Sequence, residues 1–381
     1  ALPLLVHLAR REQQQPIPDR GIDGGIQVGS KVLLAGADPC AGAAPTLDAN
    51  LRAVCLAQGA PAASIGAIQT PSADQANATG GGNPNIRPET AKTFTVGMVL
   101  QPRNFVSGLT VSVDYYNIKV SNAITAATPL DIMGACFDNI TAASATSEAC
   151  TSIRRNPANG RLSGTSTATN PILGLPQPLT NNGRLATDGI DLSVNYQTDL
   201  NFAQLALSFN GNWTNKSTFR ASSTSYNRDC VGYFSVNCAS IQPEFSFTQR
   251  TTFTFGKVDL SLLWRYIDSV KYEGQASDYV ARGFTDASRN LFNGEITGPS
   301  PLAGKSYNFN KISAYNYFDL TTRFGITDNI DLTMSAFNIF DKKPPLVGSA
   351  AGTTTYNSGN TFPSTYDAVG RRFAATARLK F

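Results

Sequence analysis

Apolar and polar residues alternate along most of the chain after residue 88. In the segment 205–213, leucine and aromatic residues fall on one face and serine and asparagine fall on the other. The segment 258–266 repeats this pattern, with aspartate, serine and arginine on its polar face. A period of two residues is typical of β-strands that have one apolar and one polar face. The same pattern predicts nine strands, at about 89–100, 109–120, 187–199, 205–216, 244–255, 258–267, 314–326, 330–340 and 370–381.

The connections between these predicted strands alternate in length. Those after the first, third, fifth and seventh strands are short, around 102–108, 200–204, 256–257 and 327–329. Those after the second, fourth, sixth and eighth strands are long, at about 121–186, 217–243, 268–313 and 341–369. A compact soluble domain rarely contains several structureless loops of this size. One rim with tight turns and one rim with long, extracellular loops is typical of outer-membrane barrels.

These two patterns predict an all-β fold, the C-terminal portion of an antiparallel transmembrane β-barrel. A soluble β-sandwich or β-helix also has alternating strands, but it buries the apolar face and does not sort its loops by length. Aromatic residues near strand ends or on apolar faces favour the barrel, because such residues form girdles at membrane interfaces. Residues 1–88 are rich in Gly, Ala and Pro without a sustained period, and Ala1–Leu8 fits neither a signal peptide nor a spanning segment.

The composition argues against several classes of protein. Charged residues make up 15% of the 381 residues, whereas about 25% is usual in soluble domains. The net charge of +4 is small and dispersed, which does not favour nucleic-acid binding. The single histidine, His7, argues against a multi-histidine metal site and a Ser-His-Asp triad. No phosphate, dinucleotide or metal motif fits, so no enzyme, catalytic residue, metal or cofactor is predicted.

The six cysteines fall outside the predicted strands as three local pairs, Cys40 with Cys55, Cys136 with Cys150 and Cys230 with Cys238. Six cysteines allow fifteen connectivities, and local pairing is favoured because the members of each pair share one loop. A zinc site is less favoured, since it needs closely spaced pairs such as C-x2-C and none occurs. Disulfides form in an oxidising compartment, so we expect these loops to face outside or to mature in a periplasm.

Charged residues are predicted on the lumen side of the strands, opposite the large apolar side chains: the site candidates Arg250, Asp259, Arg265, Asp319 and Arg323, with Asp191, Glu244, Arg372 and Arg378 on the same side. One interpretation is a charged lumen that guides a polar substrate. The interpretation that we favour is salt bridges between strands, or to a domain that fills the lumen. Aromatic residues of the predicted loops are expected to pack the loops together rather than to stack on a ligand: Tyr226, Tyr233, Phe234, Tyr307 and Phe309.

Several segments carry motifs of a known family. Residues 83–93 read NPNIRPETAKT and residues 109–118 read LTVSVDYYNI. They resemble the N-P-x-L-x-P-E-T-A … V-D-Y-Y region of TonB-dependent outer-membrane receptors. Residues 337–342, FNIFDK, and the last strand from Gly370 resemble the family's x-N-L-F-D-K strand end and closing strand. Asp38, Pro39, Cys40 and Cys55 resemble a cysteine-bearing loop of some members, so the resemblance covers about 38–381.

The resemblance implies a barrel of about 22 strands with an N-terminal plug, which takes up a scarce nutrient such as a siderophore, cobalamin or a carbohydrate. The TonB complex of the inner membrane would supply energy through the plug. Because nothing in 1–37 resembles a plug or an energy-coupling box, we expect a fragment of such a receptor. Its expected parts are an unassigned remnant at 1–37, a cysteine-bearing extracellular loop region at 38–88 and barrel at 89–381. The expected location is the outer membrane of a Gram-negative bacterium.

Two other functions stay open, a passive porin-like channel and a soluble extracellular carbohydrate-binding β-protein. A porin would be a complete barrel with an even number of strands, whereas the sequence predicts nine. A carbohydrate-binding protein would stay soluble without detergent.

The last predicted strand resembles the assembly signal of outer-membrane proteins, because it ends in an aromatic residue. Phe373, Leu379 and Phe381 lie on one face of this strand. An exposed strand can add to another sheet through its backbone, with alternate side chains providing specificity. The expected partners are the barrel-assembly machinery and, around the apolar face, outer-membrane lipid. The alternative is an ordinary last strand that happens to end in Phe.

Overall fold

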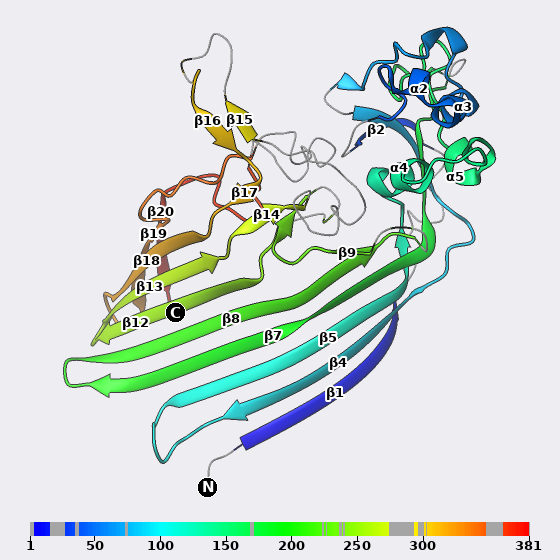
Figure 1. Cartoon of the computed structure of the whole chain (residues 1–381). Helices are drawn as coiled ribbons and strands as arrows, with labels where there is room; N and C mark the ends of the chain where they lie inside the picture. The colour runs from blue at the N-terminus through cyan, green and yellow to red at the C-terminus, as the bar shows by residue number, and fades with distance from the viewer. Residues whose placement is uncertain are drawn as a thin grey trace.

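The computed structural model consists of one large curved antiparallel sheet with groups of smaller elements at one of its rims (Figure 1). The structure describes residues 4–15, 27–34, 38–72, 75–167, 171–222, 225, 227–235, 238, 241–273, 293–295, 301, 303–347 and 361–380. No described helix is long and apolar enough to cross a bilayer.

The main sheet contains all nine predicted strands. They are β4 (Glu89–Leu100), β5 (Leu109–Thr125), β7 (Thr180–Leu200), β8 (Ala203–Arg220), β12 (Phe245–Phe255), β13 (Val258–Ile267), β18 (Tyr315–Gly325), β19 (Ile330–Phe337) and β20 (Arg372–Leu379). Each pairs antiparallel with the next in this order. The predicted all-β antiparallel fold is therefore confirmed, and β5, β7 and β8 extend further towards the long connections than predicted.

A further strand, β1 (Leu4–Gln15), pairs antiparallel with β4 along its whole length, from Leu4 opposite Leu100 to Gln15 opposite Glu89. The sequence analysis leaves 1–37 unassigned because it lacks a period of two, and the structure places part of this segment in the main sheet. With β1, the described part of the main sheet has ten strands that are hydrogen-bonded one after another, and this series is called the path of the sheet. An odd number of strands therefore no longer argues against a porin. β1 and β20 are the two edges of this path, and the sheet is not closed between them.

The connections sort by length as predicted. Residues 101–108, 201–202, 256–257 and 326–329 form the short turns at one rim, and the long connections leave from the other. The segment between β1 and β4 belongs to the long rim, because Gln15 lies opposite Glu89. Gly108 closes the first short turn with a φ of +80°, and a Cβ there would clash with the carbonyl oxygen of Gln197. Only glycine fits this close approach.

The first two long connections fold together. They contain β2 (Gln27–Leu33), α2 (Ala44–Leu47), α3 (Ala49–Ala57), η1 (Ala62–Ser64), β3 (Gln75–Gly81), α4 (Pro129–Phe137), η3 (Ser144–Thr146), α5 (Glu148–Thr151) and β6 (Leu175–Pro178). Helix α3 begins after Asp48, whose carboxylate accepts hydrogen bonds from the backbone N–H groups of Asn50 and Leu51. Val54, Ile153 and other buried apolar residues of both connections share one core. Residues 38–88 are thus a folded unit together with the next connection.

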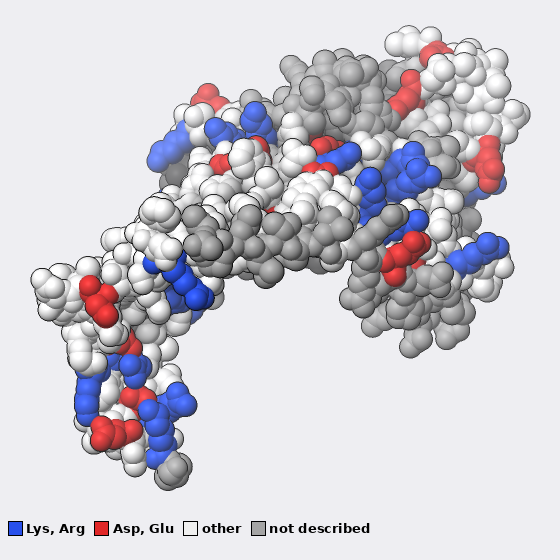
Figure 2. Space-filling view, turned by 90° about the horizontal axis from the view of Figure 1, so that it is seen from below, with Lys and Arg blue, Asp and Glu red and all other residues white. Residues whose placement is uncertain are grey.

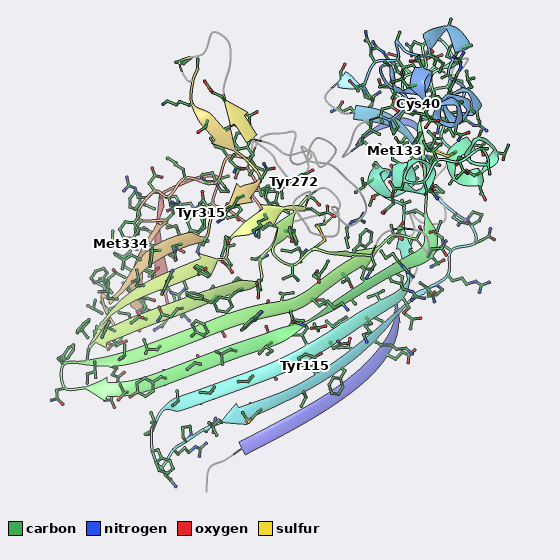
Figure 3. All side chains as sticks on the ribbon, viewed as in Figure 1. Cys40, Tyr115, Met133, Tyr272, Tyr315 and Met334 are labelled. Atoms are coloured by element: carbon green, nitrogen blue, oxygen red, sulfur yellow. A yellow bond between two sulfur atoms is a disulfide. The ribbon has the colours of Figure 1, made fainter. Side chains whose placement is uncertain are left out.

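The remaining described elements of the long rim are short strands. They are β9 (Arg228–Asp229), β10 (Tyr233–Phe234), β11 (Ile241–Gln242), β14 (Val270–Tyr272), β15 (Asn293–Glu295), β16 (Ser306–Asn308) and β17 (Lys311–Ile312). Strands β11, β10, β14 and β17 form a small sheet, which packs on Tyr317, Phe362 and Tyr366. In Figure 3, Tyr272 and Tyr315 lie near this small sheet, whereas Cys40 and Met133 lie in the folded unit of the first two long connections.

The two faces of the main sheet differ in chemistry. One face carries large apolar side chains, and several of them are exposed, including Leu260 (40%), Leu262 (36%) and Met334 (53%). The registers place the predicted lipid-facing residues together on this apolar face: Leu207, Phe209, Leu260, Leu262, Phe318 and Leu320. Aromatic rings contact each other across its strands, as Phe209 and Phe247 do at 5.2 Å between centroids. The opposite, polar face carries the charged residues of the strands.

Candidate functional site

The charged residues predicted on the polar face are brought together there. Arg265 donates from Nε and Nη2 to the two carboxylate oxygens of Asp319, at 3.1 and 3.2 Å. Arg323 pairs with Asp259 at 2.6 Å and with Asp331 at 3.2 Å. Each partner lies on a neighbouring strand, so these ion pairs connect β13, β18 and β19. This is the interpretation that the sequence analysis favours, and the orientation of the face towards a lumen stays a prediction.

Arg250, the fifth predicted residue, lies on the same face and donates to Ser261 Oγ at 2.9 Å. Ser261 also accepts a hydrogen bond from Thr252 Oγ1 at 3.0 Å. Figure 2 shows the molecule from below, and on this side acidic and basic side chains lie interspersed without a broad area of one sign. The polar face is therefore held by local pairs of opposite charge and by hydroxyl groups.

A hollow of about 430 Å³ opens on the polar face where β5, β7, β8, β12 and β13 run side by side. Asn212 Nδ2 donates to Asp191 Oδ1 at 2.8 Å and to the Tyr116 hydroxyl at 3.2 Å. Asp114 lies directly opposite Asp191 and accepts from Ser112 Oγ at 2.6 Å. Further side chains that can donate or accept hydrogen bonds line the hollow: Ser193, Asn210, Ser246, Thr248 and Arg265. This arrangement can hydrogen-bond a polar molecule.

Sequence reasoning does not single out Asp114, although strand parity places it on the polar face. The missing information is the register of β5 against β7, which brings Asp114 opposite Asp191 across a gap of many residues. Register is fixed by the whole length of two strands and by the turns that join them. A pair of carboxylates of this kind is therefore visible only in the folded sheet.

Three long connections meet at Arg228 in β9. Its guanidinium donates to Asp131 in α4 at 3.0 Å and to Glu273 after β14 at 3.1 Å. Ser235 also hydrogen-bonds to Glu273. The three charged side chains are only 1–2% exposed. Burying charges is unfavourable unless they are paired and hydrogen-bonded, so this network fixes the three connections relative to one another.

The first two long connections are joined by a second buried ion pair. Arg155 donates from Nη1 and Nη2 to the carboxylate of Asp38 at 2.8 and 2.7 Å, and both side chains are fully buried. Arg155 Nε also donates to Gln58 Oε1 at 2.7 Å. The bidentate geometry fixes the relative orientation of the two side chains and also strengthens the ion pair. The sequence offers no signal for this pair, because 117 positions separate its members.

The six cysteines form three disulfides with the expected local pairing: Cys40 with Cys55, Cys136 with Cys150 and Cys230 with Cys238. All three lie in the long connections, outside the main sheet. Cys136 and Cys150 belong to the core that the first two connections share. Disulfides and buried ion pairs together give the long rim a defined structure.

The loop aromatics pack against other loop residues where the structure describes them. Phe234 is fully buried, and its ring lies 5.8 Å from those of Tyr272 and Phe362. The rings of Tyr307 and Phe309 contact each other at 5.1 Å. Tyr233 is half-buried in the small sheet. Tyr226 lies outside the described residues.

The residues of the predicted assembly signal lie on the edge strand β20. Phe373 and Leu379 are 76% and 57% exposed on the apolar face. Phe381 lies outside the described residues, so its role stays a prediction. Within the described ranges, no group of three or more His, Cys, Asp or Glu side chains could hold a metal ion.

Comparison with known proteins gives a family. The family model "TonB dependent receptor-like, beta-barrel" matches residues 45–339 of the chain. The chain belongs to this family. This match confirms the resemblance seen in the motifs at 83–118 and 337–342. TonB-dependent receptors are transport proteins of the outer membrane of Gram-negative bacteria. No curated protein matches the chain.

Solved structures of TonB-dependent receptors are similar in fold. A mutant of the ferric enterobactin receptor PfeA from Pseudomonas aeruginosa has a TM-score of 0.50 and 12% sequence identity. The match covers 99% of this chain and 38% of the PfeA chain. The siderophore receptor PirA from Acinetobacter baumannii has a TM-score of 0.44 and 13% sequence identity, and the match covers 85% of this chain and 35% of the PirA chain. The FrpB iron transporter from Neisseria meningitidis has a TM-score of 0.42 and 11% sequence identity, and the match covers 77% of this chain and 32% of the FrpB chain. The chain thus spans about a third of the length of these structures, and identities this low bear on the fold alone.

Proposed function

We propose that this chain is part of the barrel wall of an outer-membrane receptor for energised uptake of a scarce nutrient, such as a siderophore, cobalamin or a carbohydrate. The observation that carries the proposal is the family match over 45–339. The apolar face would contact outer-membrane lipid, and the polar face would line the path of the nutrient. Because lipid offers no hydrogen-bond partners, the backbone of such a wall must be paired between strands, as it is along β4 to β19.

Within this receptor the parts would have separate tasks. Residues 89–381 would supply the wall and 38–88 an extracellular loop region, while a plug domain and the TonB complex would provide energy coupling. The charged residues of the polar face would keep the strands together through their ion pairs. The hollow around Asp114, Asp191 and Asn212 would hydrogen-bond a polar nutrient. The buried network at Arg228 would hold the long connections over this path.

A binding assay tests the nutrient-receptor proposal. The refolded chain is titrated with a ferric catecholate siderophore, cobalamin and a maltooligosaccharide, and the fluorescence of its tryptophans is followed. We expect one ligand class to bind, and Asn212→Ala to weaken that binding about tenfold, because a hydrogen-bonding side chain of the hollow is lost. Asn215→Ala is the matched control, since Asn215 lies three positions away and bonds to Asp188 on the other face. Equal effects of both variants, or no binding by any of the three ligands, would refute the proposed use of this hollow.

A further inference from the structure

The ring of Tyr116 on β5 lies across the neighbouring strand β7, on the polar face of the main sheet. Tyr116 is directly opposite Gly189. A Cβ added to Gly189 would lie 2.5 Å from the Tyr116 hydroxyl and 2.8 Å from the ring carbon that carries it. Because glycine has no side chain, the phenol can cover this position and reach Asn212 on β8. The half-buried ring therefore borders the hollow, which Asn212 lines.

Asn212 fixes this ring and the carboxylate of Asp191 at the same time. Its Nδ2 group donates to the Tyr116 hydroxyl at 3.2 Å and to Asp191 Oδ1 at 2.8 Å. Its Oδ1 accepts a hydrogen bond from Thr214 Oγ1 at 2.9 Å. Both amide hydrogens and the amide oxygen are thus engaged, so the side chain cannot rotate without losing a bond. Tyr116 and Asp191 are held beside each other before a ligand arrives, which lowers the entropy cost of binding.

A second row of polar side chains crosses the hollow next to Asp191 and Asn212. The registers place Ser193, Asn210 and Thr248 side by side on β7, β8 and β12. Ser193 Oγ donates to Asn210 Oδ1 at 2.6 Å. Asn210 and Thr248 are exposed, and no hydrogen bond to another described residue engages Asn210 Nδ2 or Thr248 Oγ1. A molecule in the hollow therefore meets donors and acceptors that are open to it.

The charge of this part of the polar face disfavours an anionic ligand. Alternation and register put Asp114 and Asp191 on the polar face of β5 and β7, and they put no described Lys or Arg on the polar face of β4, β5, β7 or β8. Arg265 is the basic residue that lines the hollow, and Asp319 binds its guanidinium through two hydrogen bonds. Like charges repel a ligand from a site, so an anionic ferric catecholate fits less well than an uncharged nutrient.

An aromatic ring beside a carboxylate and amides suits the chemistry of a sugar. A sugar ring has C–H groups on its faces and hydroxyl groups around its edge. The C–H groups carry a small positive charge and pack on the negative face of an aromatic ring. Carboxylates accept hydrogen bonds from the hydroxyl groups, and amides both donate and accept. The hollow of about 430 Å³ lies within the usual size of small-molecule sites, about 300–1,000 Å³.

We propose that Tyr116, Asp191 and the hollow beside them bind a sugar ring of an uncharged carbohydrate. The inference rests on the proposed function and selects one of its nutrient classes. The sugar packs against the ring of Tyr116, and the carboxylate of Asp191 accepts hydrogen bonds from its hydroxyl groups. Asn210 and Thr248 bond to further hydroxyl groups from the second row. Asn212 is a positioning residue, because it holds Tyr116 and Asp191 in place.

The test is calorimetric titration of the refolded full chain with uncharged trisaccharides of glucose, xylose, mannose and N-acetylglucosamine, and with the anionic trigalacturonate. We expect at least one uncharged trisaccharide to bind, and trigalacturonate to bind at least tenfold more weakly. Tyr116→Leu should weaken binding of the uncharged sugar about tenfold, and Tyr116→Phe, which keeps the ring, less than about threefold. Tyr115→Leu is the matched control, because Tyr115 is the neighbouring residue on the opposite, apolar face (Figure 3) and should change binding less than about twofold.

Asp191→Asn is a second, independent variant, because it keeps the size of the side chain and decides the question even where Tyr116→Leu does not fold. It should weaken binding of the uncharged sugar about tenfold, whereas loss of a negative charge would strengthen binding of an anion. Equal effects of Tyr116→Leu and Tyr115→Leu would show that Tyr116 only covers Gly189, and would overturn the proposal. No binding by any trisaccharide would overturn it as well. If a ferric catecholate siderophore binds instead, and Asp191→Asn strengthens that binding, the proposed function stands with another nutrient class.

Discussion

Arg228 is a buried cation that two carboxylates from different connections share. Replacing it with methionine keeps the apolar part of the side chain but leaves Asp131 and Glu273 buried without their cation. Removing one partner of a buried ion pair usually costs about 3–5 kcal/mol. We therefore expect Arg228→Met to lower the free energy of opening of the long connections by that amount, measured by native-state proteolysis.

Lys271→Met is the control for Arg228→Met, because Lys271 lies in the neighbouring strand β14 with an exposed side chain. Surface substitutions of this kind usually change stability by about 0.5 kcal/mol or less. Protease resistance of Arg228→Met equal to that of Lys271→Met would contradict a stabilising role of the network.

Tyr366 is a buried phenol in the connection that follows β19. Burial raises the pKa of Tyr366 above its usual range, and the neighbouring Tyr315 and Tyr317 raise it further. A tyrosine in an unfolded chain ionises near pH 10. Because the folded pKa lies higher, the stability that the neutral phenol contributes is complete below about pH 10 and is lost as the pH rises further through the folded value.

We therefore expect this connection to become sensitive to protease above about pH 10. Tyr366→Phe should remove most of this pH dependence and should not lower stability at neutral pH, because the hydroxyl has no hydrogen-bond partner among the described residues. Tyr307→Phe, in another connection, should leave the alkaline loss unchanged. The same alkaline loss in Tyr366→Phe would show that another group is responsible.

At the scale of elements, alternation of residue type locates the nine strands β4, β5, β7, β8, β12, β13, β18, β19 and β20 of the main sheet, because each has one apolar and one polar face, but it does not find the two-residue strand β9 that pairs with β8. It does not find β1, whose residues LLVHLARREQQQ lack a period of two. This strand is defined by twelve residue pairs with β4, a long-range interaction that one segment of sequence does not encode. Pairing with a strong neighbour commonly overrides local propensity in sheets.

Elements of the long connections are less predictable than the strands of the wall. The local disulfides can be inferred because each pair of cysteines shares one loop. The charged networks cannot, because Arg228 and Asp131 are 97 positions apart and only folding brings them together. Alternation along each strand predicts which charged residues lie on the polar face. The register of β13 against β18 then determines that Arg323 pairs with Asp259 and Arg265 pairs with Asp319.

The two faces of β13 and its neighbours should differ in their tolerance of charge. Leu262 lies at the middle of β13 on the apolar face, and a charge at such a lipid-facing position costs about 2–4 kcal/mol. Leu262→Arg should therefore lower the free energy of unfolding from vesicles by this amount in urea titrations. Asn210→Arg, on the polar face of β8 and exposed, should cost much less. A larger loss for Asn210→Arg would reverse the assignment of the two faces.

The whole molecule combines a sheet with strictly alternating strand directions and a long rim with its own cores. From β4 to β20 the sheet follows simple rules, since consecutive strands of its path pair with each other and short turns join them at one rim, whereas β1 is placed by its long-range pairing with β4. The long rim depends on three disulfides and two buried ion-pair networks. This division explains why alternation along the sequence locates most strands of the sheet, whereas the structure of the long rim becomes visible only in the folded chain.

The open edges of the main sheet give the last prediction. β20 has one neighbour among the described strands, so it presents a row of unpaired backbone groups that lipid cannot satisfy. We expect this 381-residue chain, refolded alone in detergent, to associate through its edges and to run above the monomer mass in size-exclusion chromatography with light scattering. A chain that is monomeric under these conditions would contradict the prediction.

Proline substitutions can test which backbone groups cause this association. The N–H of Lys380 bonds to the carbonyl oxygen of Asn329 on the β19 side. Because N–H groups alternate in direction along an antiparallel strand, those of Thr376 and Arg378 also point to β19, and those of Ala375 and Ala377 point to the free edge. Proline lacks this donor, so Ala375→Pro with Ala377→Pro should shift the chain towards monomers without loss of the β19–β20 pairing. Thr376→Pro should instead detach β20 and leave association through the newly exposed edge of β19.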